Sequence, residues 1–192
     1  PVPTDKPAAL PETDLASRIE AEVPAEVDEE FKSAAQEAYG KSRGWTNEFN
    51  KYGGEYGLPE NLLIAVAMAE SGGRPGVGSS KGARGLMQFM PATARGRGLI
   101  VTDPASKDPA LDERLDPTKS IKAAAWKLSR DLKKVDGDIA AALMHYNWGA
   151  GNYRKWLKDP NRKMPEETRM YITRVRYAML IAAQARQKKA QQ

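Results

Sequence analysis

Residues 58–73 read Leu58-Pro59-Glu60-Asn61-Leu62-Leu63-Ile64-Ala65-Val66-Ala67-Met68-Ala69-Glu70-Ser71-Gly72-Gly73, the most apolar run of the chain. Pro59 suits the first position of a helix, because its missing N–H would have no partner there. From Leu62 onward apolar side chains occupy nearly every face, which predicts a helix buried inside a small domain. Gly72 and Gly73 are expected to end this helix.

Glu70 lies in the last turn of the predicted helix. A carboxylate is disfavoured there, because the carbonyl end of a helix carries partial negative charge. Burial also disfavours the charged form, so we expect the pKa of Glu70 to be raised toward neutrality, as a general acid requires. The alternative is a side chain that reaches solvent at a frayed helix end, and this stretch alone does not choose between the two.

The composition is that of a soluble globular protein with one domain and an extension. The chain has 192 residues, 41% of them apolar and 29% charged, which is enough to bury a core. No run reaches the roughly 18 to 20 apolar residues of a membrane span. The sequence shows no secretory leader and begins with Pro1 instead of Met, so we expect a processed product or an excised piece.

Several kinds of chemistry are excluded by residue counts. The chain has no cysteine and one histidine, His145. Thiol catalysis, disulfides and metal sites built from several histidines or cysteines are therefore ruled out. A Ser-His-Asp triad is not favoured, since no G-x-S-x-G elbow accompanies His145. We expect no metal and no cofactor.

Charge is distributed unevenly along the chain. Residues 1–40 hold ten acidic and three basic side chains, whereas residues 41–192 hold fifteen acidic and twenty-seven basic ones. The basic body could bind nucleic acid, an anionic wall polymer or an acidic membrane surface, or it could be only a solvated face. No pattern in it indicates specific nucleic-acid binding.

Three segments follow from these patterns. Residues 1–44 are predicted to form a flexible, partly helical acidic arm, with one helical pattern interrupted at Pro24 and a second ending at Gly40. This arm could pack on the domain or join it to a larger virion or envelope assembly. Residues 45–182 are predicted to form the main domain, and residues 183–192 a basic, disordered tail.

The main domain is predicted to be mainly α-helical, with little or no β-structure. Aromatic residues recur at helical spacing between Trp45 and Tyr56, as in a stripe that faces a core. Helix starts are predicted at Asp116 and at Asp138, where an aspartate can cap the first turn. The best strand candidate, residues 99–102, is short.

Two predicted buried helices end in turns rich in polar and aromatic groups, Glu70-Ser71-Gly72 and Tyr146-Asn147-Trp148-Gly149. Between them lies a glycine-rich loop, residues 72–85, which is typical of the wall of a site. Gln88 follows as a polar amide among apolar neighbours, and a buried amide must be hydrogen-bonded. Carboxylate, amide and phenol groups beside a glycine-walled cleft suit a sugar polymer.

Cleavage of a glycosidic bond needs an acid on the leaving oxygen, which Glu70 can supply. Most glycosidases also use a second carboxylate as nucleophile or base. None stands in these turns, and the nearest candidates lie in a long connection: Asp103, Asp108 and Asp112. A mechanism with one acid stays open if the substrate's own acetamide or hydroxyl replaces that carboxylate.

Four short motifs occur in the order and rough spacing of the lytic transglycosylase catalytic domain: Glu70-Ser71, Gly85-Leu86-Met87-Gln88, Tyr146-Asn147 and Glu167-Thr168-Arg169-x-Tyr171. Over about residues 45–180 the chain therefore resembles this family, which has a lysozyme-like helical fold with a catalytic cleft. The resemblance implies cleavage of the β-1,4 bond between N-acetylmuramic acid and N-acetylglucosamine in peptidoglycan without water, leaving a 1,6-anhydro end. It implies Glu70 as the acid and then the base. It also implies that six residues orient Glu70 or line the sugar-binding cleft: Ser71, Met87, Gln88, Tyr146, Asn147 and Tyr171.

The chain departs from the family at His145, where alanine is usual, and at Ala150, where proline is common. We interpret His145 as a variant packing or rim residue. Residues 98–103 and 112–117 resemble the version found at the head of large phage internal virion proteins. We therefore prefer delivery to the bacterial cell wall within a phage virion over export of a bacterial enzyme by a signal not present in this chain.

Two other functions stay open. A hydrolytic muramidase on the same fold would leave reducing ends instead of anhydro ends. A peptidoglycan-binding module would keep the cleft without catalysis, which the presence of Glu70 disfavours.

Overall fold

The computed structural model describes residues 12–102 and 111–191. Their fold is helical, with two isolated β-bridges but no strand, so the prediction of a mainly α fold is confirmed. The strand candidate at residues 99–102 is irregular chain. The described helices are α1 (Glu12–Glu22), α2 (Glu29–Ser42), η1 (Arg43–Trp45), α3 (Thr46–Glu55), α4 (Leu62–Ser71), α5 (Pro91–Arg95), η3 (Glu113–Leu115), α6 (Pro117–Lys134), α7 (Ile139–Asn147), α8 (Ala150–Lys158) and α9 (Glu166–Ala190).

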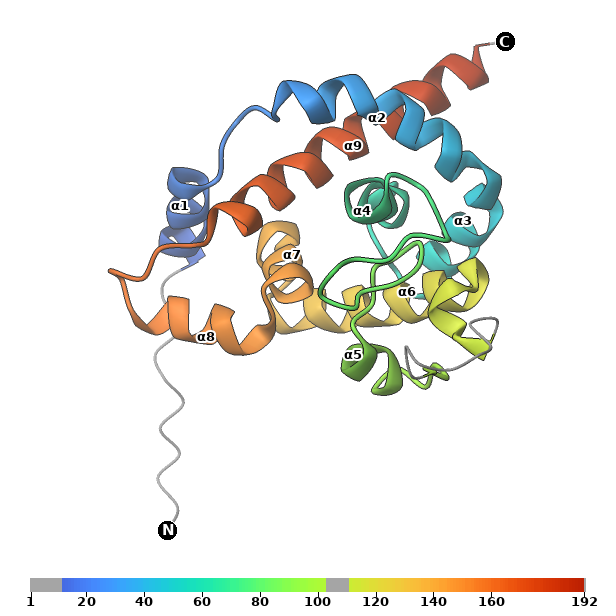
Figure 1. Cartoon of the computed structure of the whole chain (residues 1–192). Helices are drawn as coiled ribbons and strands as arrows, with labels where there is room; N and C mark the ends of the chain where they lie inside the picture. Colours follow the sequence, from blue (N-terminus) through green and yellow to red (C-terminus); the bar gives the residue numbers. More distant parts are fainter. Residues whose placement is uncertain (1–11, 103–110, 192) are drawn as a thin grey trace.

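Helix α4 is the central element of the molecule. Figure 1 shows it end-on, with α2 and α9 above it, α3 to its right and α6 below. Every side chain from Leu62 to Met68 is buried, and the helix packs most extensively on α9. The prediction that this run forms a buried helix is therefore confirmed.

The two ends of α4 differ in how well the sequence predicts them. The helix begins at Leu62, so the predicted start at Pro59 was wrong. Asn61 adopts a left-handed φ of 65°, and the Leu62 N–H donates to the Pro59 carbonyl at 3.2 Å, which makes a separate turn of these residues. At the other end Gly72 has a φ of 59°, and its N–H donates to the Met68 carbonyl at 3.0 Å. The predicted end is confirmed.

Helix α2 continues through Gly40 and ends at Ser42, so the predicted end at Gly40 was wrong. Its Ala35 and Ala38 side chains are buried in the core, and the Ser42 hydroxyl donates to the Ala38 carbonyl at 2.8 Å. A glycine inside a helix costs about 1 kcal/mol. Here the packing of neighbouring residues outweighs that cost.

Other local predictions are confirmed. Asp116 accepts a hydrogen bond from the Lys119 N–H at 3.0 Å and caps α6, as Asp138 caps α7. In α3 the aromatic stripe faces the core, where Phe49 and Tyr52 are buried.

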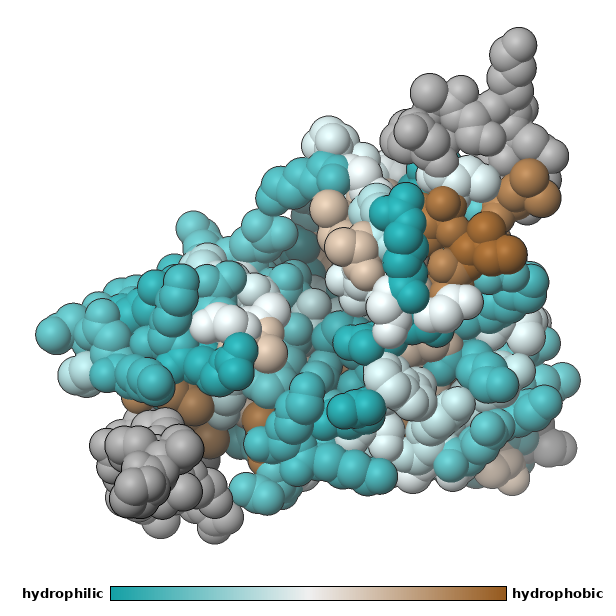
Figure 2. Space-filling view, turned by 90° about the horizontal axis from the view of Figure 1, so that it is seen from below, coloured by the Kyte–Doolittle hydropathy of each residue, from teal (hydrophilic) through white to brown (hydrophobic). Residues whose placement is uncertain are grey.

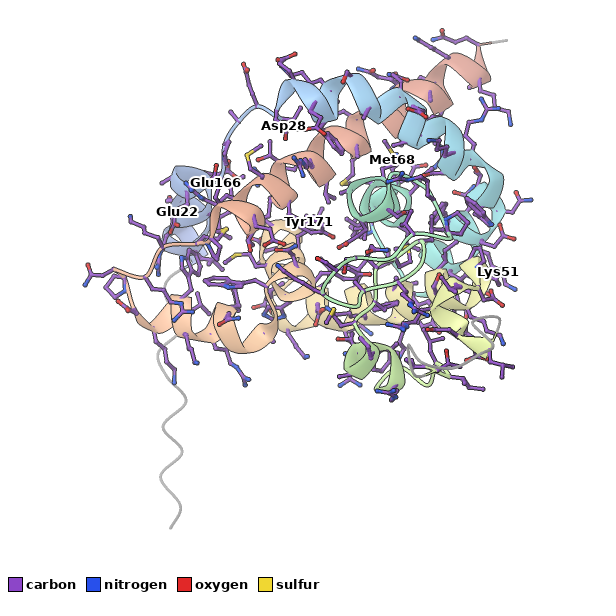
Figure 3. The ribbon with its side chains drawn as sticks, in the orientation of Figure 1. Glu22, Asp28, Lys51, Met68, Glu166 and Tyr171 are labelled. Carbon is purple, nitrogen blue, oxygen red and sulfur yellow. The ribbon has the colours of Figure 1, made fainter. Side chains whose placement is uncertain are left out.

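The acidic N-terminal helices pack on the domain. The Arg18 guanidinium donates to the Trp156 carbonyl at 2.7 Å. Glu22 accepts hydrogen bonds from the Trp156 indole at 3.0 Å and from the Met164 N–H at 2.6 Å. Figure 3 shows Glu22 on α1 close to the start of α9. Helix α1 is therefore held against α8 and the segment before α9, while α2 packs on α4 and α9.

Helix α9 reaches Ala190 and so includes most of residues 183–192, for which the sequence predicts a disordered tail. Alanine, glutamine, lysine and arginine all favour helices. The high charge of this segment is compatible with a helix, because its side chains beyond residue 185 are exposed.

The described part of the chain contains no helix long and apolar enough to cross a membrane. The face shown in Figure 2 is mostly hydrophilic, with a hydrophobic patch beside the grey residues at the upper right of the view.

Candidate active site

A groove with a volume of about 670 Å³ opens beside the C-terminal end of α4. Its lining comes from the ends of α4 and α7, the start of α9, one side of α6 and the loop that joins α4 to α5. Four of the predicted site residues line it: Glu70, Gln88, Tyr146 and Asn147. The fold therefore brings together motifs that are far apart in the sequence.

Glu70 stands half-buried in the wall of the groove. Burial raises the pKa of its carboxyl from 4.5 to about 7, while Tyr171 and Lys127 act to lower that pKa. The helix does not fray at Glu70, because Gly72 closes it two residues later. The predicted rise in pKa is confirmed, and at neutral pH Glu70 keeps its proton for a large part of the time, as a general acid requires.

Two tyrosines flank Glu70. Figure 3 shows Tyr171 directed from α9 toward the centre of the molecule. Its buried hydroxyl makes no hydrogen bond of standard geometry with the described residues. It nevertheless lies close enough to the Glu70 carboxyl to lower the pKa of that carboxyl. The Tyr146 hydroxyl donates to the Met87 carbonyl at 3.1 Å. Burial raises the pKa of both phenols well above the usual value, so both act only as protonated groups.

Gln88 is fixed by the backbone around it. It adopts a left-handed φ of 47°, and its amide nitrogen donates to the Gly85 carbonyl at 2.8 Å and to the Val77 carbonyl at 3.2 Å. These bonds satisfy the amide nitrogen, while the residue still lines the groove. The Met87 side chain is buried, and Met87 contributes its carbonyl to Tyr146.

Asn147 and Ser71 occupy different places around the groove. Asn147 lines it and accepts a hydrogen bond from the Thr168 hydroxyl at 2.9 Å. Ser71 is buried, and its hydroxyl donates to the Ala67 carbonyl at 3.0 Å and accepts from the Arg74 N–H at 3.2 Å. Ser71, like Met87 and Tyr171, lies behind the groove wall.

The loop that forms one wall of the groove is tied to η3. A side chain at Gly85 would place its Cβ 1.7 Å from the Arg114 carbonyl oxygen, so only glycine allows this approach. The Arg114 guanidinium donates to the carbonyls of Gly82 at 2.8 Å and Phe89 at 3.2 Å, and it is paired with Asp112 at 2.6 Å. Both ends of the segment 82–89 are therefore held by one buried arginine.

Asp112 does not line the groove, and its carboxylate is instead paired with Arg114. Although burial acts to raise it, the pKa of Asp112 is lowered by hydrogen bonds from Arg114. Of the three aspartates considered as a second carboxylate, Asp103 and Asp108 lie outside the described residues. The carboxylate that shares the groove with Glu70 is instead Glu167, an exposed residue 3.7 Å from Lys81.

The lining residues that sequence reasoning did not select include Lys127, Trp148 and Glu167. Glu167 and Trp148 stand inside or beside the motifs but were not assigned a role. The sequence gives no signal for Lys127, because a lysine four residues before an aspartate is also common on exposed helix faces.

His145 is buried next to this site, with its ring 4.5 Å from that of Tyr153. This position agrees with the interpretation of His145 as a packing residue. Among the described residues no group of three or more His, Cys, Asp or Glu side chains could hold a metal ion.

Two phage transglycosylases are similar to this chain in sequence. It is 41% identical over 129 residues to the peptidoglycan transglycosylase gp16 of Escherichia phage T7, a match that covers 65% of this chain and 9% of that protein. It is 34% identical over 113 residues to the transglycosylase of Enterobacteria phage PRD1, covering 55% of this chain and 38% of that protein. The chain thus spans a minor part of these relatives.

Solved structures support the same relationship. The soluble lytic transglycosylase Slt70 of Escherichia coli superimposes with a TM-score of 0.60 at 27% identity, over 71% of this chain and 24% of that one. The lytic transglycosylase Slt of Pseudomonas aeruginosa gives a TM-score of 0.59 at 26% identity, over 72% of this chain and 24% of that one. The model of the transglycosylase SLT domain matches residues 47–168, well over half of the chain. The chain therefore belongs to the transglycosylase SLT domain family of peptidoglycan lytic transglycosylases.

Proposed function

We propose that this chain cleaves the bond between N-acetylmuramic acid and N-acetylglucosamine in peptidoglycan without water, and that Glu70 acts first as acid and then as base. The observation that carries this proposal is a carboxyl with a pKa of about 7 at the wall of a polar groove. A group with this pKa can give and recover a proton at neutral pH.

The proposed reaction needs one proton-transferring group. Glu70 gives its proton to the glycosidic oxygen, the bond from C1 to that oxygen breaks, and the electron pair leaves with the N-acetylglucosamine oxygen. The 6-hydroxyl of the muramyl residue then bonds to C1 and returns its proton to Glu70. The product is a 1,6-anhydro end, and the enzyme is restored without water.

The amides of the groove are suited to hold the sugar. Within the described residues, Gln88 Oε1 accepts no hydrogen bond and Asn147 Nδ2 donates none, although both residues line the groove. One acceptor and one donor are thus available for sugar hydroxyls or acetamides. We propose that Ser71, Met87 and Tyr171 act from behind the wall by holding the end of α4 and Tyr146 in place.

Glu167 supports the main alternative, which is a hydrolytic muramidase. Hydrolysis would use a second carboxylate to activate water, and Glu167 lines the same groove. It is exposed and lies near Lys81, so its charge is screened by solvent. Hydrolysis would produce reducing ends, and a Glu167→Gln variant would then lose activity as severely as a Glu70 variant.

The decisive experiment is mass spectrometry of muropeptides released from purified peptidoglycan. We expect anhydro ends from the wild-type chain and a loss of release of roughly 10²-fold or more for Glu70→Gln, with binding to peptidoglycan retained. Glu55→Gln is the matched control, because Glu55 is exposed on α3 and outside the groove. Reducing ends, or lysis by Glu70→Gln, would contradict the proposal.

We also propose that the chain reaches the cell wall as part of a phage virion. Support comes from its similarity to proteins of the phages T7 and PRD1. Detection of the chain in purified virions by mass spectrometry, with wall lysis by those virions, is the test.

A further inference from the structure

Lys127 is a buried cation in the wall of the groove. Its side chain is 10% exposed, and its ammonium donates to Asp131 Oδ2 at 2.7 Å. The same ammonium lies 4.5 Å from the centre of the Tyr146 ring and 3.4 Å from the His145 carbonyl. An ammonium removed from water is costly unless it is paired, and Asp131 supplies the pair.

An ion pair buried for stability alone is easily replaced, since apolar side chains of similar size are often equally stable. The position of the Lys127–Asp131 pair is therefore a better guide to its role than its contribution to stability. Lys127 lines the same groove as Glu70, and its positive charge acts to lower the pKa of the Glu70 carboxyl. Asp131 is buried and does not line the groove. Of this ion pair, only the positive partner therefore lines the groove that holds the candidate acid.

We propose that Lys127 is a positioning residue whose charge, held in place by Asp131, limits the proton affinity of Glu70 and fixes the Tyr146 ring beside it. This inference rests on the proposed role of Glu70 as acid and base. Without such a neighbour, burial would raise the pKa of the carboxyl further and make it a weaker acid toward the leaving oxygen. A nearby ammonium stabilises the carboxylate that forms after proton transfer.

The charged and titratable groups around both residues are few. Glu70 faces Tyr171 and Glu167 from α9, Tyr146 from α7 and Lys127 from α6. Among these, Lys127 is the cation. Besides Glu70 and the Tyr146 ring, Lys127 faces Asp131, Lys134, Arg97 and the carbonyl of His145. Burial and the two neighbouring cations lower the pKa of Lys127, and Asp131 opposes them.

The test is the pKa of Glu70, measured by ¹³C NMR of carboxyl-labelled protein, with the signal assigned from its absence in Glu70→Gln. In Lys127→Met we expect this pKa to move upward by about half a unit or more, because an opposite charge is lost. The alkaline limb of the pH–activity profile should move upward with it. Lys127→Arg should keep the wild-type value, since it keeps the charge.

Lys134→Met is the matched control. Lys134 is an exposed lysine that faces the other oxygen of Asp131 at 3.7 Å and does not line the groove. Its removal should leave the Glu70 pKa and the activity unchanged. If Lys127→Met does not fold, Lys127→Met/Asp131→Leu removes both charges and should show the same upward shift.

An unchanged Glu70 pKa in a folded Lys127 variant would overturn the inference, and so would an equal shift in Lys134→Met. The NMR measurement does not depend on activity. A chain that cleaves nothing but shows the shift would refute the proposed function and leave the electrostatic role of Lys127 intact.

Discussion

Ionisation of Glu70 opposes folding, because the folded chain surrounds the carboxyl while the unfolded chain leaves it in water. Its pKa is about 7 in the fold against 4.5 in the unfolded reference. Between these values the folded state holds a proton that the unfolded state has released. Stability should therefore decrease as the pH rises from about 4.5 to about 7, by up to about 3 kcal/mol.

Glu70→Gln should remove this dependence. We expect the variant to match the wild type near pH 4.5 and to be more stable at pH 8, by up to about 3 kcal/mol. Urea unfolding at a series of pH values measures the difference. Glu55→Gln should follow the wild-type curve, since Glu55 is exposed. Parallel curves for the wild type and Glu70→Gln would show that the carboxyl is not buried as described.

Single residues of the site differ in how far the sequence could predict them. Glu70 was predictable, since an apolar run and two glycines place it at the end of a buried helix. Lys127 was not, because a lysine and an aspartate four residues apart are common on exposed helix faces. Only the approach of α7 to α6 shows that this pair is buried.

At the scale of elements, the groove wall depends on a buried ion pair outside the groove. Arg114 is 1% exposed and holds the carbonyls of Gly82 and Phe89, while Asp112 neutralises it. Asp112→Ala would leave a buried guanidinium without its partner, which costs about 3–5 kcal/mol. We expect a large loss of stability and faster hydrogen exchange in residues 76–90.

Hydrogen exchange followed by mass spectrometry can test this prediction peptide by peptide. Glu113→Ala is a suitable control, because Glu113 is the neighbouring acid and its partners, Lys119 and the Ile100 N–H, lie outside residues 76–90. The control should leave exchange in residues 76–90 unchanged. Equal protection of that segment in Asp112→Ala would mean that Arg114 does not anchor the loop.

Element boundaries were predictable where one residue decides them. Asp116, Asp138 and Gly72 each make the expected hydrogen bond at a helix end. The start of α4 was mistaken because Pro59 fits a first helical turn equally well, and the left-handed turn at Asn61 has no glycine to reveal it. Gly40 was mistaken for a stop because tertiary packing overrides its low helix propensity.

At the scale of the whole molecule, the site exists because α4, α6, α7 and α9 meet. Thr168 and Asn147 are twenty-one residues apart and share a hydrogen bond, and Tyr146 reaches Met87 across fifty-nine residues. The order of the motifs could be recognised in the sequence, but their distances could not, since these depend on how the helices cross. The same is true of α1, for which the sequence left open whether the acidic arm packs on the domain or joins a larger assembly.

Helix α1 contributes to the stability of the domain through one half-buried acid. Glu22 satisfies the Trp156 indole N–H and the Met164 N–H, and Trp156 is fully buried. Glu22→Ala would leave both donors unpaired, so we expect the free energy of unfolding, measured with urea, to fall by roughly 2–4 kcal/mol.

Glu20→Ala is the control on the same helix, because Glu20 is 62% exposed in its ion pair with Arg176. Such exposed pairs contribute less than about 1 kcal/mol. Neither variant should change the type of muropeptide end, since α1 lines no part of the groove. Equal stability of the two variants would mean that α1 does not fold as part of the domain.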